Sequence, residues 1–192
     1  MGSAPVPSRY LDIGQQLASL LGSSLQDASA DSLRDLARAY DPSADESRIS
    51  AEVFLFFKYL LVQACVGVFP ESEADSVVQG LLEVLKERAA GLDFSSERQQ
   101  AMEQMWRLRA AQFDQPFSQD RTQFLNDEAG VVYWKETVNR FCQNVADVDS
   151  PPDSWAGSDG PSQAASHAVT MVLDRMVSAL GEMNRFHFRA AD

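Results

Sequence analysis

The sequence predicts an all-α protein, a multi-helix bundle of about seven helices around a central apolar helix at residues 51–69. Along most of the 192 residues, apolar side chains recur three and four positions apart, as they do on one face of a helix. The stretch AEVFLFFKYLLVQACVGVF, residues 51–69, is apolar on almost every side, which is typical of a helix enclosed by other helices. No segment forms a convincing strand pattern, so the fold class is a helical bundle.

The first two predicted helices are short and amphipathic. The first covers about residues 8–22, and its apolar face consists of Ile13, Leu17, Leu20 and Leu21. The second carries the same spacing through Leu33, Leu36, Ala37 and Tyr40. We expect Ser29 or Asp31 to cap its start. The Asp41-Pro42 pair ends it, because proline disfavours helical geometry in the residue before it.

The third predicted helix contains the apolar stretch at 51–69. Ser43 and Glu46 have the spacing of a capping box, Ser50 is an alternative start, and Pro70 ends the helix. A membrane-spanning helix needs about 20 predominantly apolar residues. Here Lys58 and Gln63 interrupt the run, and a lysine near mid-bilayer costs about 2.5 to 3.5 kcal/mol. We therefore interpret the segment as a core helix and predict no membrane partner.

Two further helices follow. Residues 72–90 place Val77, Val78, Leu81, Leu82 and Leu85 on one face, and Gly91 is the expected left-handed cap. Residues 96–113 have an inward face that is predicted to contain Met102, Met105, Trp106 and Phe113. Gln115-Pro116 then breaks the chain.

The last two predicted helices carry seven-residue repeats. In residues 120–147 the repeated positions are Phe124, Val131, Val138 and Val145, followed three residues later by Trp134, Phe141 and Val148. In residues 162–188 they are Ala165, Val172, Ala179 and Phe186, followed four residues later by Val169, Met176 and Met183. The two seams predict an antiparallel C-terminal helix pair.

The segment between these helices, residues 147–163, is rich in Pro, Gly, Ser and Asp, and predicts a mobile loop. Trp155 is its one large aromatic residue. Two interpretations stay open: an exposed anchor for another protein, or a side chain that folds back and tethers its own loop. Apart from this loop, we predict a single all-helical domain over residues 1–192.

Charge and cysteine content exclude several classes of function. With 28 acidic and 16 basic residues the net charge is −12, so we predict no nucleic-acid partner. Cys65 and Cys142 are the only cysteines, and both lie in apolar helical patterns, which is typical of buried structural thiols. The first ten residues show no secretory signal, so we expect a cytoplasmic protein.

The motifs of catalysis and cofactor binding are not present in the sequence. There is no glycine-rich phosphate loop, no Gly-x-Ser-x-Gly elbow and no Glu-x-x-His pair. His167 and His187 are 20 residues apart, too far along one helix to share a metal ion. His167 with Asp174, seven residues on, is a weak catalytic pair, and a solvent-exposed histidine is the simpler interpretation. We predict no catalytic residue, no cofactor and no metal.

The remaining candidate site is rich in methionine. Except for Met1, the methionines lie in two predicted helices, 96–113 and 162–188. Flexible thioethers adapt to irregular partners, so the sequence predicts a ligand or partner groove, with core filling as the alternative. Its residues are Met102, Met105, Trp106, Met176 and Met183. Beside them, Arg107 and Arg109 are candidates to receive an acidic group.

We therefore expect a non-catalytic protein–protein interaction or adaptor protein. Its partner is another protein or a second copy of the chain. The alternative is a carrier or sensor that encloses a small apolar ligand between helices 96–113 and 162–188.

Overall fold

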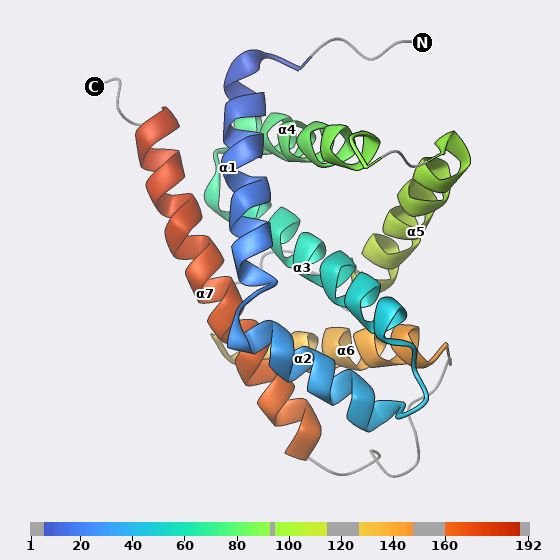
Figure 1. Ribbon diagram of the computed structural model, residues 1–192. Coiled ribbons are helices and arrows are strands. Elements are labelled where there is room, and N and C mark those ends of the chain that lie inside the picture. The colour runs from blue at the N-terminus through green and yellow to red at the C-terminus, as the bar shows by residue number, and fades with distance from the viewer. Residues whose placement is uncertain (1–5, 93–94, 115–126, 148–159, 189–192) are drawn as a thin grey trace. The chain divides into compact units, whose positions relative to one another are not determined.

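The computed structural model of the chain describes residues 6–92, 95–114, 127–147 and 160–188. Within them lie seven helices and no strand, which confirms the predicted all-α fold class (Figure 1). The helices are α1 (Ser8–Ser24), α2 (Ala28–Tyr40), α3 (Glu46–Val68), α4 (Glu71–Ala90), α5 (Ser96–Asp114), α6 (Asp127–Ala146) and α7 (Gly160–Phe188).

The chain divides into two compact units, which are described separately below. Unit 1 consists of Met1–Ser23, Leu60–Met105 and Leu173–Asp192. Unit 2 consists of Ser24–Tyr59 and Trp106–Val172. Helices α3, α5 and α7 each contribute residues to both units.

The predicted core helix is α3. Seven consecutive residues, Leu55–Leu61, are buried, and Lys58 in their midst is only 9% exposed. Among the described residues, α3 is the one helix long and apolar enough to cross a membrane, and 56% of its apolar window is buried by the rest of the chain. A core helix passes the same test of length and composition, and the burial observed here favours that interpretation.

In unit 1, α1 and α4 touch backbone to backbone. Gly14 of α1 and Gly80 of α4 are both buried. A Cβ atom on Gly14 would collide with the Gly80 carbonyl, and one on Gly80 would collide with the carbonyl of Tyr10. Only residues without a side chain allow the two helices to approach this closely.

One carboxylate joins the same two helices near their starts. Glu73 Oε2 accepts hydrogen bonds from Tyr10 Oη at 2.6 Å and from Arg9 Nη2 at 2.7 Å. The Arg9 guanidinium also lies 4.8 Å from the centre of the Phe188 ring of α7. These contacts fasten α4 and the end of α7 to the first turns of α1.

The end of α3 is held by α7, also within unit 1. Asn184 is buried, and its Nδ2 donates to the Val68 carbonyl at 2.8 Å. Nearby, the rings of Phe69 and Phe188 meet edge to face with centres 5.7 Å apart. The amide satisfies one of the carbonyls that a helix C-terminus leaves unpaired.

Unit 2 has an aromatic centre. Phe56 of α3 lies 5.1 Å from Phe113 of α5 and 5.3 Å from Phe141 of α6, ring centre to ring centre. Tyr59 lies 5.3 Å from Phe113. All four rings are buried, so α3, α5 and α6 share one core.

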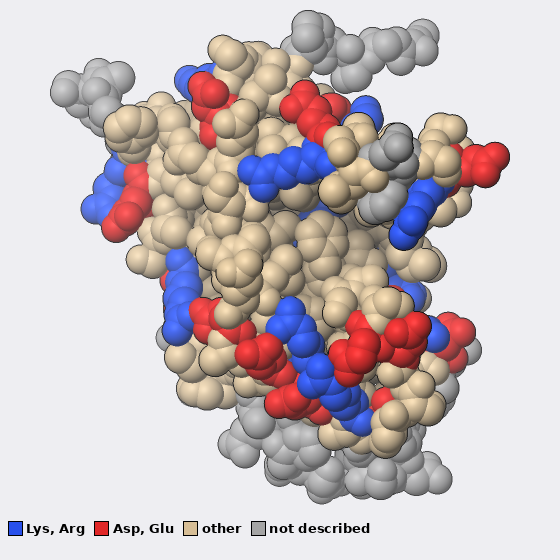
Figure 2. Space-filling view, in the orientation of Figure 1, with Lys and Arg blue, Asp and Glu red and all other residues tan. Residues whose placement is uncertain are grey.

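Charged side chains of both signs lie together on α2. Figure 2 shows blue and red residues mixed over the lower part of this face, where Figure 1 places α2. Arg34 pairs with Asp31 at 2.6 Å, and Arg38 pairs with Asp35 and with Glu46, each at 2.7 Å. This part of the surface therefore presents paired charges rather than a field of one sign.

Two predicted helix starts are wrong by two to five residues. The N-cap of α2 is Asp27, whose carboxylate accepts from the Ser29 N–H, rather than Ser29 or Asp31. Similarly, α3 begins after Asp45, whose carboxylate accepts from the Ser47 N–H at 2.9 Å and whose pKa is lowered by that bond. Ser43 instead binds the Asp41 carboxylate, so no capping box forms.

The face and the end of α4 also differ from the prediction. The buried residues are Ala74, Val77, Gly80, Leu81 and Val84. The predicted face was therefore rotated toward Val78, Leu82 and Leu85, which are half-buried. Gly91 follows the helix as expected, but its φ of −67° is right-handed, so it is not a left-handed cap.

The described seam positions of α6 are buried, whereas those of α7 are buried only in part, because Ala179 and Met183 are half-buried. Val138, Phe141 and Val145 of α6 and Val169, Val172 and Met176 of α7 are buried. Phe186 departs from the seam, because it is 74% exposed. The remaining α6 seam positions, Phe124, Val131, Trp134 and Val148, lie outside the described side chains, as does Ala165 of α7.

Candidate functional site

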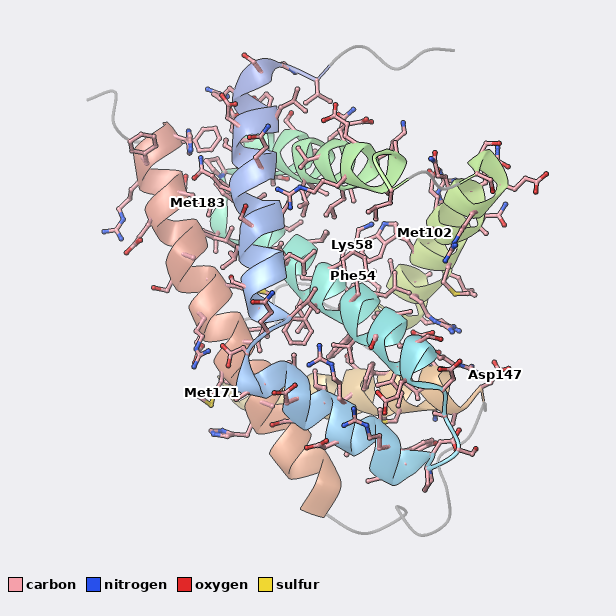
Figure 3. All side chains as sticks on the ribbon, viewed as in Figure 1. Phe54, Lys58, Met102, Asp147, Met171 and Met183 are labelled. Carbon is pink, nitrogen blue, oxygen red and sulfur yellow. The ribbon has the colours of Figure 1, made fainter. Side chains whose placement is uncertain are left out.

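The predicted methionine residues occupy different environments. Met102 and Met105 of α5 are each 43% exposed, so the prediction that they point inward is wrong (Figure 3). Met176 of α7 is fully buried, and Met183, seven residues further along the same helix, is half-buried. Core filling, the alternative interpretation, describes Met176.

Met183 lines a shallow hollow in unit 1. The hollow has a volume of about 550 Å³, is open to solvent, and is lined by Met183 together with Asp12, Gln15, Gln16 and Ser19 of α1. At its edge Gln16 Nε2 lies 3.2 Å from His187 Nε2, at hydrogen-bonding distance. The lining contains neither Met102 nor Met105, and most of its side chains are polar.

The C-terminal half of α5 is fixed to α3 by a buried ion pair in unit 2. Arg109 Nε donates to both carboxylate oxygens of Glu52, at 2.9 and 3.0 Å, and Arg109 Nη2 donates to Oε1 at 2.6 Å. Arg109 Nη1 donates to Gln112 Oε1 at 2.9 Å. The Arg109 guanidinium therefore binds the Glu52 carboxylate through two nitrogens, and its bond to Gln112, one turn further along α5, orients the guanidinium.

Beside the ion pair, Phe113 fills an aromatic slot. Its ring is fully buried and packs against Phe56 and Tyr59 of α3. The Tyr59 hydroxyl donates to the Phe113 carbonyl at 3.2 Å, which caps the end of α5. We define the seat as Glu52, Phe56, Tyr59 and Phe141, the residues of α3 and α6 around Arg109 and Phe113.

Trp106 is a further residue of α5 that contacts α3. Its half-buried ring lies under the ammonium of Lys58, with Lys58 Nζ 4.0 Å from the ring centre. Lys58 and Phe54 project from the same side of α3, four residues apart (Figure 3). A cation over an indole face stabilises the contact and keeps the lysine charge among polarisable groups.

Three large apolar side chains of α5 are exposed. Two of them, Met105 and Met102, lie four and seven positions before Arg109 and so continue the Arg109 side of the helix toward its N-terminus. Leu108 is 52% exposed, in addition to Met102 and Met105. These three residues, spaced three apart, follow a stripe about a third of the helix circumference wide. We call Met102, Met105 and Leu108 the α5 face. Of the whole helix, only Arg109 and Phe113 are buried.

Sequence reasoning missed the role of Glu52. Arg109 was a candidate to receive an acidic group, and the group it receives is a carboxylate 57 positions earlier in the chain. One signal was present: Glu52 is an acidic residue at the start of an otherwise apolar core helix. A buried charge in such a helix calls for a partner of opposite sign.

The two cysteine thiols are inert. Cys65 and Cys142 are free and buried, and burial raises the pKa of each to about 12. The thiolate is the reactive form of cysteine, so neither sulfur is suited to nucleophilic chemistry near neutral pH.

The remaining candidates form no site among the described residues. His167 and Asp174 are both exposed on α7. In the parts of the chain that the structure describes, no group of three or more His, Cys, Asp and Glu side chains could hold a metal ion. Trp155 and positions 148–159 of the predicted loop lie outside the described residues, whereas residues 160–163, also expected in the loop, are helical and begin α7.

Comparisons of the chain with protein-family models, with curated proteins and with solved structures found no match.

Proposed function

We propose that the protein is a non-catalytic interaction protein that binds another protein through the α5 face. The observation that supports this is the exposure of Met102, Met105 and Leu108, between 43% and 52%, along one stripe of a helix whose buried residues are Arg109 and Phe113 near its C-terminus. Large apolar side chains gathered in a stripe, rather than scattered singly, are typical of interaction surfaces.

The expected partner is an amphipathic helix. Methionine side chains adapt to the shape of an apolar helix, as in other helix-binding surfaces. Covering the three half-exposed side chains contributes about 1 kcal/mol each, half the value for complete burial. This is too little for a permanent complex, so we expect transient binding. Self-association through the same face is the second form of this proposal.

Site-specific crosslinking tests the proposal. A photo-crosslinking amino acid replaces Met105 in the full chain, and a matched chain carries it at Gln79, an exposed position of α4. In an extract of the native host we expect one discrete adduct from position 105, none from position 79, and loss of the adduct when Leu108→Asp is added. Equal adducts from both positions would contradict the proposal, and a dimer formed by the purified chain would identify the partner as a second copy.

The alternative, a carrier of a small apolar ligand, has no specific observation in its favour. The hollow beside Met183 is open, and its lining is largely polar. The notion of a groove between α5 and α7 therefore stays a prediction.

We further propose that the protein works in the cytoplasm, apart from nucleic acid and membranes. Two free, buried thiols suit a reducing compartment. A net charge of −12 opposes binding to phosphate backbones and anionic lipid.

A further inference from the structure

We propose that the C-terminal half of α5 is an intramolecular ligand, which leaves its seat reversibly and can be replaced there by a partner helix with an arginine four residues before an aromatic residue. The proposal concerns the two buried residues of α5, Arg109 and Phe113, and its tests do not depend on a partner bound to the α5 face. Its basis is the chemistry of the seat and the two buried residues of α5 that fill it.

Helix α5 buries fewer residues than the core helix α3. Across Ser96–Asp114 only Arg109 and Phe113 are buried, and between residues 96 and 105 every side chain except the half-buried Gln99 is exposed. By contrast, α3 is buried at seven consecutive positions. Segments with little buried apolar surface open locally, at lower free energy than the core.

The ion pair gives the contact specificity more than strength. Removing Glu52 and Arg109 from water opposes most of the attraction between them, so the intact pair adds little net stability. Leaving either charge buried without the other is strongly unfavourable. The closed state therefore requires both charges.

The seat recognises two residues of the helix that occupies it, an arginine and an aromatic residue. The Glu52 carboxylate accepts three hydrogen bonds from the guanidinium of Arg109, which a lysine cannot reproduce with the same geometry. The slot between Phe56 and Tyr59 takes the ring of Phe113, one helical turn later. An arginine and an aromatic residue at positions i and i+4 of a helix are thus the chemistry that the seat selects. A partner helix with this pair reproduces the contacts of α5.

Hydrogen exchange of the full chain tests the reversible opening. In the wild-type protein we expect the amides of residues 106–114 to exchange through an opening at least about tenfold more populated than that of residues 52–61 of α3. Glu52→Gln should accelerate exchange of residues 106–114 by a further tenfold or more, with a much smaller effect on α3.

The matched control is Glu46→Gln, which removes another carboxylate of α3 that binds an arginine with two nitrogens, but one that is exposed. It should leave exchange in α5 unchanged. The proposal is overturned if residues 106–114 and 52–61 exchange through one common opening in the wild-type chain, or if Glu52→Gln accelerates both equally. The wild-type comparison decides the matter even if Glu52→Gln does not fold.

A peptide tests the exchange of occupants. In the full chain, Phe113→Ala weakens the native occupant but leaves the seat intact. A fluorescent peptide with the sequence of residues 104–114 should bind this variant at least about tenfold more tightly than the same peptide with Arg109→Ala, as measured by anisotropy. Adding Glu52→Gln to the chain should abolish the preference. Equal binding of the two peptides, or binding of neither, would refute the seat as a site for a partner helix.

Discussion

Asp147, the first residue after α6, has a φ of 58°, in the left-handed region that glycine adopts at least cost. Its carboxylate also lies at the negative end of the helix dipole, which disfavours an acidic group. Its ion pair with Arg48, at 3.3 Å, is exposed and contributes little (Figure 3 labels Asp147). Two unfavourable terms therefore act at this residue against one weak favourable contact.

We expect Asp147→Gly to raise the free energy of unfolding by about 0.5 to 1 kcal/mol, because glycine relieves the backbone strain and removes the charge. Asp147→Ala is the control, since it removes the same charge but keeps a Cβ in the left-handed region. Chemical denaturation measures both. A glycine variant no more stable than the alanine variant would show that the backbone at this position is not strained.

The buried thiols predict a loss of stability at alkaline pH. Each thiol has a pKa of about 12 in the folded chain, above the ordinary value of 9.0, because burial disfavours the thiolate. Because the pKa is raised in the folded chain, each protonated thiol makes its full contribution to the free energy of unfolding below pH 9. That contribution is lost as the pH rises from 9 toward 12. The slope is at most about 1.4 kcal/mol per pH unit for each thiol.

Denaturant midpoints between pH 8 and pH 11 measure this slope. In the double variant Cys65→Ala with Cys142→Ala, the decline should be shallower than in the wild-type chain, even if the variant is less stable throughout. Alkylation at pH 8 gives a second readout, because about one thiol in ten thousand is ionised there in the folded protein. Rapid labelling of the native chain would contradict the proposed burial.

At the scale of helices, the backbone contact of α1 and α4 fixes how closely they pack. Gly14→Ala or Gly80→Ala puts a methyl group against a main-chain carbonyl that cannot move away by itself. We expect each to lower the free energy of unfolding by about 1 to 3 kcal/mol, as overpacking does elsewhere.

The same helix provides the control. Gly22 of α1 has no atom within 4 Å of the position that a Cβ would take. Gly22→Ala should therefore raise stability by about 0.5 to 1 kcal/mol, through helix propensity alone. Thermal or chemical denaturation measures all three variants, and similar changes at Gly14 and Gly22 would show that the two helices are farther apart.

The sequence predicts helices better than it predicts helix ends and faces. Periodic apolar residues located every described helix, because burial of one stripe is what makes an amphipathic helix stable. The starts of α2 and α3 were misplaced because Asp27 and Asp45 compete with nearby serines as caps, and local sequence does not rank them. In α5 the predicted inward face is correct for Phe113, which is buried, but wrong for Met102 and Met105, which are exposed.

The seat shows why the candidate site was harder to predict than the fold. Arg109 and Phe113 are four residues apart, a spacing visible in the sequence, but their partners lie in α3, more than 50 positions away. Such pairings depend on how helices pack, which periodicity does not specify. The pattern shows that a helix has a buried face, without showing what that face meets.

For the whole molecule, the decisive feature is the enclosure of α3. If this helix is a core helix, the chain should remain in the supernatant after ultracentrifugation without detergent. It should also fail to float with vesicles of neutral phosphatidylcholine, which removes charge repulsion as an explanation. Flotation of the folded chain would show that α3 inserts into lipid, and the proposed cytoplasmic interaction protein would then be wrong.

The contact between Lys58 and Trp106 turns the position of α5 into an optical signal. An indole whose face lies 4.0 Å from an ammonium group emits in a different electric field from one surrounded by water. With Trp134 and Trp155 changed to Phe, the remaining emission would come from Trp106 alone, so its wavelength would follow the departure of α5 from α3 in real time. The protein thus carries its own spectroscopic probe at the place where motion is expected.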